Sequence, residues 1–147
     1  MKLSDKTLSV LKNFSSINQS ILFKKGNKLR TISVMKNILA EATVTEEFSK
    51  DFGIYDLSQF LNVNTTLFNS PELDFGNDGY VVIREGRSKQ RFFFADPNVI
   101  VTPPDKEITL PSEDVSFELS TDQLDRLLKA AAISQLPDLS AVGENGV

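Results

Sequence analysis

The chain has 147 residues, of which 40% are hydrophobic and 24% are charged, and its formal net charge is −4. This length and apolar content are enough for one domain with its own core and part of another. The sequence contains neither Cys nor His, which excludes disulfides, thiolate metal sites and the commonest general base and metal ligand. No apolar run approaches the roughly 20 residues that span a bilayer, and the first residues do not resemble a signal peptide. We therefore expect a cytoplasmic protein without a cofactor, a metal or a membrane anchor.

Catalytic motifs are absent as well. Neither GxxxxGK[ST] nor GxGxxG occurs, and a chain without His cannot build a Ser-His or Cys-His nucleophile pair. The 20 acidic residues leave open a hydrolase that works with two paired carboxylates, but they are scattered along the chain as solvated surface charge usually is. We predict a protein that is not an enzyme, with a carboxylate hydrolase as an alternative.

The charge is unevenly distributed along the chain. Residues 1–40 hold eight basic residues and one acid, a local charge of +7, whereas residues 96–147 hold ten acids and three basic residues, a local charge of −7. A concentrated basic segment on an acidic protein favours a polyanionic partner that meets one face only. An uneven surface charge without any such partner is the alternative.

The first predicted elements are a helix and two strands. Ser4 and Asp5 are good caps for a helix, because apolar residues follow them at helical spacing. Two apolar runs then flank a Lys-Gly-Asn sequence, which is typical of strand, tight turn, strand. The apolar helix positions are Leu8, Leu11 and Phe14. The two runs are residues 21–23 and 29–34, and the turn lies at 25–27.

The same order of elements returns twice, and each cap precedes its turn Gly by roughly 22 to 25 residues, as in repeat architectures. The second copy begins with a strand at 52–55 and a helix at 56–66, which Asp56 caps and which turns Leu57, Phe60 and Leu61 inward. A strand at 72–75, a turn at 77–79 and a strand at 80–84 follow. The third copy begins with a strand at 115–119 and a helix capped at 120–122, whose buried stripe is Leu124, Leu127, Leu128 and Ala131. A strand at 139–142 and a turn at 144–146 follow. Further strands are expected at 38–44 and 91–95.

This repeat predicts an α+β fold of β-α-β-β-β units with helices on one face of antiparallel sheets. Two units form a first domain at 1–96, and a Pro-rich connector follows at 97–114 because prolines interrupt both helices and ladders. Residues 115–147 are then the incomplete start of a second domain.

The third unit lacks its return strand, so we expect a truncated form or a fragment of a longer protein, with a genuine short paralogue as the alternative. Such a unit cannot bury enough apolar surface to offset the entropy of ordering it. We expect it to fray or to pair through a strand edge with another chain, and we expect no stable trimer of the 147-residue chain.

A helical wheel separates the first helix into two faces. The apolar arc of about 120° holds Leu3, Thr7, Val10, Leu11, Phe14 and Ile17. The opposite face holds three lysines among small polar residues: Lys2, Asp5, Lys6, Ser9, Lys12, Asn13 and Ser16. In the third helix, Arg126 and Lys129 likewise lie opposite the apolar stripe, although Asp122 and Asp125 share their side.

Lysines on an exposed helix face are usually only solvated, but their agreement between units favours a shared surface. That surface would be basic and poor in aromatic residues, which suits duplex phosphate and offers no means of reading bases. The helix at 56–66 has no basic residue, so the lining would be uneven.

Other basic residues allow a second interpretation. The group that flanks the first turn consists of Lys24, Lys25, Lys28 and Arg30. The group near the segment before the triple Phe at 92–94 consists of Arg84, Arg87, Lys89 and Arg91. Cations beside aromatic residues could bind single strands by stacking, so a single-strand or general nucleic-acid-binding module is the alternative function. For the triple Phe itself, a buried strand end is the simpler expectation.

Several segments, in the right order over nearly the whole chain, resemble the DNA polymerase sliding clamps of the T-even group of tailed bacteriophages. The similar segments are Met1-Lys2-Leu3-Ser4, Leu11-Lys12-Asn13-Phe14, Ile17-Asn18, Ala40-Glu41-Ala42, Ile54-Tyr55-Asp56-Leu57, Phe60-Leu61, Ala95-Asp96-Pro97 and 119–128. The family extends beyond the length of this chain, to a complete second domain.

The resemblance implies a homotrimeric ring of two-domain subunits, with helices lining the hole and curved sheets outside. Such a ring encircles duplex DNA and tethers the replicative polymerase without sequence specificity, in the cytoplasm of the infected bacterial host. By analogy, the side chains that face DNA are Lys2, Lys6, Lys12, Arg126 and Lys129. The polymerase and the clamp loader would each dock a short peptide in an apolar cleft near the connector.

Overall fold

The computed structural model describes residues 1–147 except 107–108, 110–111, 113–114, 137 and 144–147. The chain divides into two compact units, Met1–Asp105 and Lys106–Val147. The first unit combines helices with antiparallel sheets, so the predicted α+β class is confirmed.

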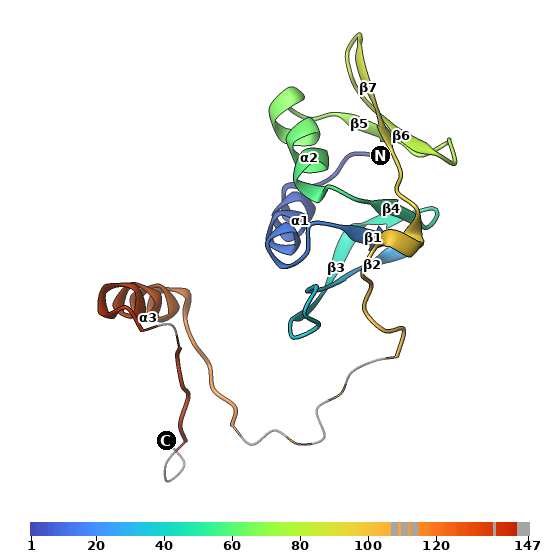
Figure 1. Cartoon of the computed structure of the whole chain (residues 1–147). Coiled ribbons are helices and arrows are strands. Elements are labelled where there is room, and N and C mark those ends of the chain that lie inside the picture. Colours follow the sequence, from blue (N-terminus) through green and yellow to red (C-terminus); the bar gives the residue numbers. More distant parts are fainter. Residues whose placement is uncertain (107–108, 110–111, 113–114, 137, 144–147) are drawn as a thin grey trace. The chain divides into compact units, whose positions relative to one another are not determined.

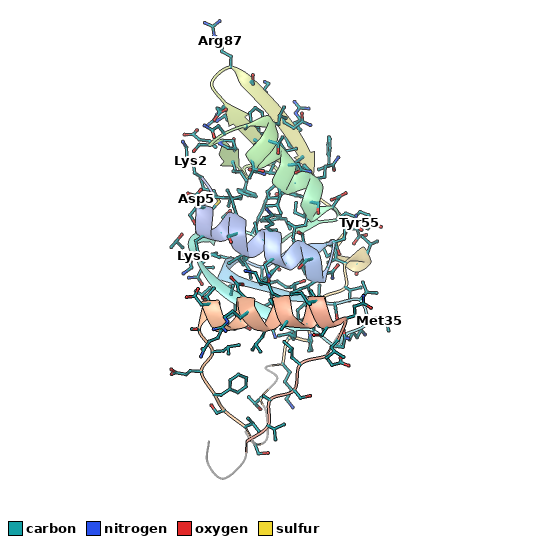
Figure 2. All side chains as sticks on the ribbon, turned by 90° about the vertical axis from the view of Figure 1, so that its left-hand side faces the viewer. Lys2, Asp5, Lys6, Met35, Tyr55 and Arg87 are labelled. Atoms are coloured by element: carbon teal, nitrogen blue, oxygen red, sulfur yellow. The ribbon has the colours of Figure 1, made fainter. Side chains whose placement is uncertain are left out.

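The first unit follows the predicted order of elements closely. Its helices and strands are α1 (Asp5–Ile17), β1 (Ile21–Phe23), β2 (Gly26–Ile32), β3 (Leu39–Phe48), β4 (Phe52–Ile54), α2 (Leu57–Asn62), β5 (Glu72–Asp74), β6 (Tyr80–Glu85) and β7 (Ser88–Phe93). A π-helical turn, Val63–Leu67, prolongs α2, and a 3-10 turn, Pro97–Val99, follows β7. The two helices lie side by side on one face of the unit, with the strands on the other (Figures 1 and 2).

The strand pairing differs from the hairpin that the first turn predicts. β1 pairs antiparallel with β4, placing Ile21 opposite Ile54, whereas β2 pairs antiparallel with β3. The third sheet is β5-β6-β7, also antiparallel. Gly26 has a φ of 112°, a left-handed conformation that glycine adopts at little cost, and here it redirects the chain between two sheets. The turn was therefore located correctly, but it does not join paired strands.

The repeat is visible in how the two halves of this unit exchange strands. β4, which precedes α2, pairs with β1, the first strand after α1. Reciprocally, the Met1 amine donates a hydrogen bond to the Leu73 carbonyl (2.8 Å), and the Leu73 N–H donates to the Met1 carbonyl (2.7 Å). The segment before α1 thus pairs with β5, the first strand after α2. Each half begins with backbone that belongs to the other half's sheet.

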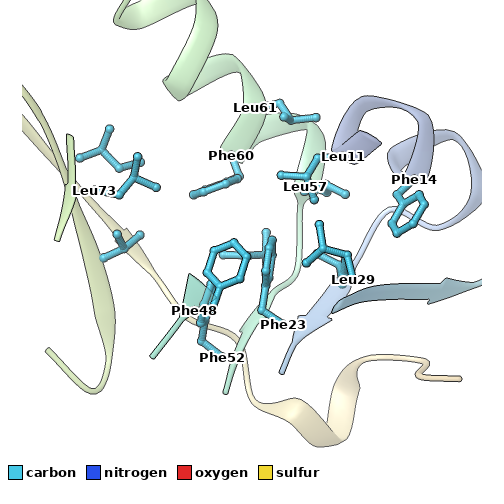
Figure 3. Packing of buried hydrophobic residues seen from close by; sticks show 14 of the residues in the cluster. Leu11, Phe14, Phe23, Leu29, Phe48, Phe52, Leu57, Phe60, Leu61 and Leu73 are labelled. Atoms are coloured by element: carbon cyan, nitrogen blue, oxygen red, sulfur yellow. The ribbon is translucent and has the colours of Figure 1, made fainter. Parts of the chain in front are cut away.

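One core lies beneath both helices (Figure 3). Its centre is a group of phenylalanines, in which the rings of Phe23 and Phe52 stack at 4.5 Å and Phe48 meets Phe23 edge-on at 4.9 Å. Leu11 of α1 and Leu57 of α2 are fully buried against this group. Because both helices contribute to the same core, the relative position of their outer faces is fixed.

The residues after β7 are attached to the first unit. Ala95 forms a bridge with Gly53, and a Cβ on Gly53 would lie only 2.6 Å from the Ile100 side chain. Further along, the Asn18 amide donates to the Val101 carbonyl (3.3 Å). The first compact unit therefore includes the first part of the segment predicted as connector.

The second unit has one described helix, α3 (Thr121–Ser134), capped by Ser120 as the sequence predicts. Its apolar stripe is exposed, at 41% for both Leu124 and Leu127, so the prediction of a buried stripe is wrong in this structure. The strands predicted at 115–119 and 139–142 do not form either, and the turn at 144–146 lies outside the described residues. A helix closes its hydrogen bonds within itself, whereas a strand needs a partner, and the described part of this unit offers none.

Candidate nucleic-acid interface

The start of α1 is held by its own cap and by a carboxylate from the sheet. The Ser4 side chain accepts a hydrogen bond from the Thr7 N–H (3.3 Å). Glu46 of β3 accepts hydrogen bonds from the Ser4 N–H and from the Thr7 hydroxyl. Burial alone would raise the pKa of Glu46, but the hydrogen bonds from Thr7 and Ser4 outweigh it and lower the pKa from 4.5 to about 2. An ionised carboxylate is therefore built into the beginning of this helix.

The two faces of α1 are those that the wheel predicts. Thr7, Leu11 and Phe14 are buried. The opposite face is solvent-exposed along its whole length and comprises Asp5, Lys6, Ser9, Lys12, Asn13 and Ser16. Among the residues that the structure describes, no carboxylate lies within ion-pair distance of Lys6 or Lys12. Their charges remain available to a polyanion.

Lys2 is exposed as well, but it lies before the helix rather than on it, because α1 begins at Asp5. Its Nζ donates to the Ser70 hydroxyl at 3.4 Å, a long contact next to β5. Figure 2 shows Lys2, Asp5 and Lys6 together at the N-terminal end of α1. The extension of the wheel to Lys2 is thus wrong in detail, although the side chain lies near Lys6.

The outer face of α2 is uncharged. Asp56 caps the helix by accepting from the Gln59 N–H (2.8 Å), and Leu57, Phe60 and Leu61 face the core. Residues 57–67 contain no charged side chain. Apart from Leu67, which is 60% exposed, their exposed groups are hydroxyls and amides, so the predicted unevenness of this surface is present.

A shallow cavity of about 530 Å³ lies between α1 on one side and α2 with the π-helical turn on the other. Small polar residues line most of it, with Lys12 as its only charged residue: Leu8, Ser9, Lys12, Ser15, Ser58, Leu61, Asn62, Thr65 and Thr66. The aromatic residues of α1 and α2, Phe14 and Phe60, are both buried. The two helices can contact phosphates through a few cations and hydroxyls, but neither helix exposes a ring on which a base could stack; Tyr55, just before the α2 cap, is 62% exposed.

The remaining predicted contacts belong to the second unit. Arg126 and Lys129 are exposed on α3, as are Asp122 and Asp125 on the same helix. The structure therefore brings Lys2, Lys6 and Lys12 together in one unit and describes Arg126 and Lys129 separately.

Three of the four basic residues around β2 form ion pairs, and two of these share one carboxylate. Lys28 and Arg30 both meet Glu41, at 2.7 and 3.0 Å, and the Lys28 hydrogen bond lowers the pKa of Glu41. The pKa of Asp51 is lowered mainly by a hydrogen bond from the Lys25 N–H. The Lys24 ammonium, whose Nζ lies 3.2 Å from Asp51 Oδ2, lowers it further. These ion pairs make the β2 side less attractive to DNA than its residue count indicates.

The triple Phe divides between core and surface. Phe92 and Phe94 pack against the core, as a buried strand end should. Phe93 is 69% exposed and meets the Tyr80 ring at 5.7 Å, while the Arg91 guanidinium lies 5.2 Å from that ring. The expectation of burial is confirmed in part for Phe92 and Phe94, which are half-buried, and it is wrong for Phe93, because alternate residues of β7 face opposite sides of the sheet.

A second cavity, of about 580 Å³, lies between the β1–β2 region and residues 102–105. The resemblance implies an apolar cleft near the connector, but the sequence assigns none of its residues. Arg30 fixes the overlying chain by donating to the Pro104 carbonyl at 3.0 Å. The lining mixes cations with apolar groups: Leu22, Lys24, Lys25, Lys28, Arg30, Thr102, Pro103, Pro104 and Asp105. The signals were a basic turn and a Pro-Pro pair, but they lie about 75 residues apart, so only folding could bring them together.

Within the described residues, no group of three or more acidic side chains is placed to hold a metal ion. None of the described helices has the length and hydropathy needed to cross a membrane.

Comparisons with known proteins point to one family. The family model for DNA polymerase processivity factors matches residues 2–102. Proteins named sliding clamp are similar over 99% of this chain: that of Escherichia phage RB69 is 33% identical over 146 residues, that of Vibrio phage KVP40 34% over 149, and that of Enterobacteria phage T4 32% over 146. The chain spans 64–66% of the length of these relatives.

Proposed function

The chain belongs to the family of DNA polymerase processivity factors, and from this membership we propose that it is a sliding-clamp subunit, which encircles duplex DNA and tethers the replicative polymerase. Its relatives bear the name sliding clamp. In this proposal the protein carries out no chemical step, and its contact with DNA is independent of base sequence.

The observation that best supports this proposal is the outer face of α1 and α2. Lys6 and Lys12 are exposed without a carboxylate partner among the described residues, while the aromatic side chains of both helices are buried. Cations of this kind attract phosphates over several ångströms without fixing a register. A closed ring needs no more than this, because its topology, rather than its affinity, keeps it on DNA.

The assembly follows the same reasoning. We propose domains at 1–96 and 115–147 joined by a connector at 97–114, and a homotrimer for the subunit at the length of its relatives. Arg126 and Lys129 would then extend the DNA-facing surface in the second domain. The acidic remainder of the chain would discourage DNA from binding elsewhere. The setting would be the cytoplasm of the infected bacterial host.

The polymerase and the clamp loader would dock on the opposite side, near the connector. The cavity beside residues 102–105 is a suitable place, because it combines Leu22 and two prolines with an overlying strap held by Arg30. A peptide with an apolar anchor and acidic flanking residues would match that lining.

The decisive experiment compares closed with open DNA. Residues 1–114 of this chain would be joined to the second domain of the phage RB69 relative and loaded onto nicked circular duplex by the clamp loader. We expect retention on circles and rapid loss after the circle is linearised, measured by gel filtration of labelled protein. Equal retention on both would contradict a ring that surrounds DNA.

The single-strand-binding alternative rests on an aromatic and cationic group on β6 and β7, formed by the exposed Phe93 and Arg91 and the half-buried Tyr80. It predicts affinity that rises with single-strand length and that falls in Phe93→Ala. Fluorescence anisotropy with oligonucleotides of increasing length separates the two functions, since the clamp proposal predicts no effect of Phe93→Ala on duplex association.

A further inference from the structure

A carboxylate occupies a core position in β3. Side chains alternate between the two faces of a strand, and in the second half of β3 the inward residues Val44, Glu46 and Phe48 are all buried. Glu46 is only 9% exposed. A buried carboxylate is costly unless hydrogen bonds compensate for lost hydration, so the position calls for an explanation.

The contacts of Glu46 account for its burial. It accepts from the Ser4 N–H, from the Thr7 hydroxyl and from the Thr45 hydroxyl, the last at 3.1 Å. No ion pair joins it to a cation among the described residues. Two of these three donors belong to the cap and first turn of α1. Negative charge is favourable there, because the N-terminal end of a helix carries partial positive charge.

This contact is one of two anchors on the N-terminal segment. The other is the backbone pairing of Met1 with Leu73 on β5. Lys2 lies between the two anchors, and Lys6 lies in the turn that the Glu46 contact begins. Two of the three cations of the first unit that are assigned to the DNA-facing surface therefore depend on backbone that is held at these points.

We propose that Glu46 is a positioning residue for DNA contact: its carboxylate holds the first turn of α1 and thereby sets where Lys2 and Lys6 stand. This inference rests on the proposed function, since it concerns the same surface. Glu46 itself does not touch DNA and, being negative, would repel it. Its contribution is therefore opposite in sign to the direct electrostatic effect of its charge.

That opposition of signs makes the test specific. Glu46→Gln and Glu47→Gln each remove one negative charge from adjacent positions of β3. Glu47 is exposed, and among the described residues it forms no hydrogen bond or ion pair with α1. Removal of a negative charge alone should strengthen association with DNA slightly, and Glu47→Gln should do so. Glu46→Gln should instead weaken association, because the first turn loosens.

The measurement is a titration of the full chain with a short blunt duplex at several salt concentrations, followed by NMR of backbone amides. Each phosphate that a cation neutralises contributes about 0.9 to the slope of log affinity against log salt. We expect Glu46→Gln to reduce that slope by up to about 2, since two lysines are affected, and to raise Ser4 amide exchange roughly tenfold or more. Glu47→Gln should leave Ser4 amide exchange unchanged and should not reduce the slope.

A second background separates positioning from general stability. In Lys2→Ala/Lys6→Ala protein, Glu46→Gln should produce no additional loss of affinity, because the side chains that it positions are gone. An equal loss in both backgrounds would overturn the proposal. Thr7→Val, which removes one hydrogen-bond donor and leaves the carboxylate, should give a smaller change in the same direction; it carries the test if Glu46→Gln proves unfolded by circular dichroism.

The outcomes also distinguish this inference from the proposed function. Association of the wild-type chain that does not respond to salt would contradict the clamp surface and, with it, the role of Glu46. Salt-dependent association that is the same in the wild type and in Glu46→Gln would contradict the role of Glu46 alone.

Discussion

The helices α1 and α3 share a serine cap and an apolar pattern, but they differ in how much of that pattern is buried. Both begin after a serine whose side chain accepts from the third residue of the helix, and both carry apolar residues at helical spacing. Yet α1 buries Thr7, Leu11 and Phe14, whereas α3 has no buried residue. A periodic pattern specifies which face a helix would bury, but the cover must come from other parts of a fold.

The two helices also differ in how they begin. The Ser120 N–H donates to the Gln123 side chain at 2.9 Å, so α3 is capped from within its own first turn. The Ser4 N–H donates instead to Glu46, a residue 42 positions away. The start of α1 therefore depends on the sheet, and the start of α3 does not.

The largest difference between the helices should appear when a leucine is truncated in each. Leu11 is fully buried, so Leu11→Ala should lower the free energy of unfolding by about 2–5 kcal/mol. Leu127 is 41% exposed, and Leu127→Ala should change it by less than about 0.5 kcal/mol. Urea titration followed by circular dichroism measures both. Similar losses would mean that the stripe of α3 is covered in solution.

The pH response should separate the two capping arrangements. The pKa of folded Glu46 is about 2, below its ordinary value of 4.5, so its ionisation stabilises the fold above pH 4.5 and this contribution is lost as the pH falls towards 2. The two pKa values correspond to at most about 3 kcal/mol. The stability difference between the wild type and Glu46→Gln, measured by urea unfolding, should shrink as the pH is lowered. The Gln123 side chain at the start of α3 cannot titrate, so the α3 cap should show no such pH response. A stability difference between the wild type and Glu46→Gln that stays constant with pH would contradict the ionised state assigned to Glu46.

Removal of the caps should have a smaller effect. Ser4→Ala should lower the stability of the first unit by about 1 kcal/mol, a typical value for an N-cap serine. Ser120→Ala should reduce helical circular dichroism without moving the unfolding midpoint of the first unit, because α3 has no buried residue. A shift of that midpoint by Ser120→Ala would show that the two regions are thermodynamically coupled.

The smallest effect on stability is expected for the exposed cations. Replacement of Lys2, Lys6 and Lys12 by Ala should leave the unfolding free energy within about 0.5 kcal/mol of the wild type and should weaken clamp loading most visibly as salt is raised. The matched Arg126→Ala/Lys129→Ala protein tests whether α3 contributes to the same surface. Loading that is unchanged across a salt series in both would remove the assignment of these cations to DNA.

Sequence reasoning succeeded where the relevant interactions are local. The sequence indicates caps at Ser4 or Asp5, at Asp56 and at 120–122, and in each case one of these residues accepts the hydrogen bond that a cap accepts. The face of α1 that carries Lys6 and Lys12 was placed correctly, because the helical period relates neighbouring residues without reference to the rest of the chain. Their role in binding DNA stays a prediction.

The failures share a different cause. Gly26 was recognised as a turn, but β1 pairs with β4 rather than β2, because pairing depends on which strands the core brings together. Glu46 lies beyond the strand predicted at 38–44, and its inward register between Val44 and Phe48 exists only because β3 extends to Phe48.

The amino-acid sequence by itself determined where helices begin, which of their faces are apolar and where the charge of each sign is concentrated. Only the tertiary structure decided that the segment before α1 joins the other half's sheet and that Glu46 meets the first turn of α1. The physical reason is range. Caps and periodicity act within a few residues, whereas strand exchange and buried carboxylates depend on groups that are distant in sequence and meet only after the core has formed.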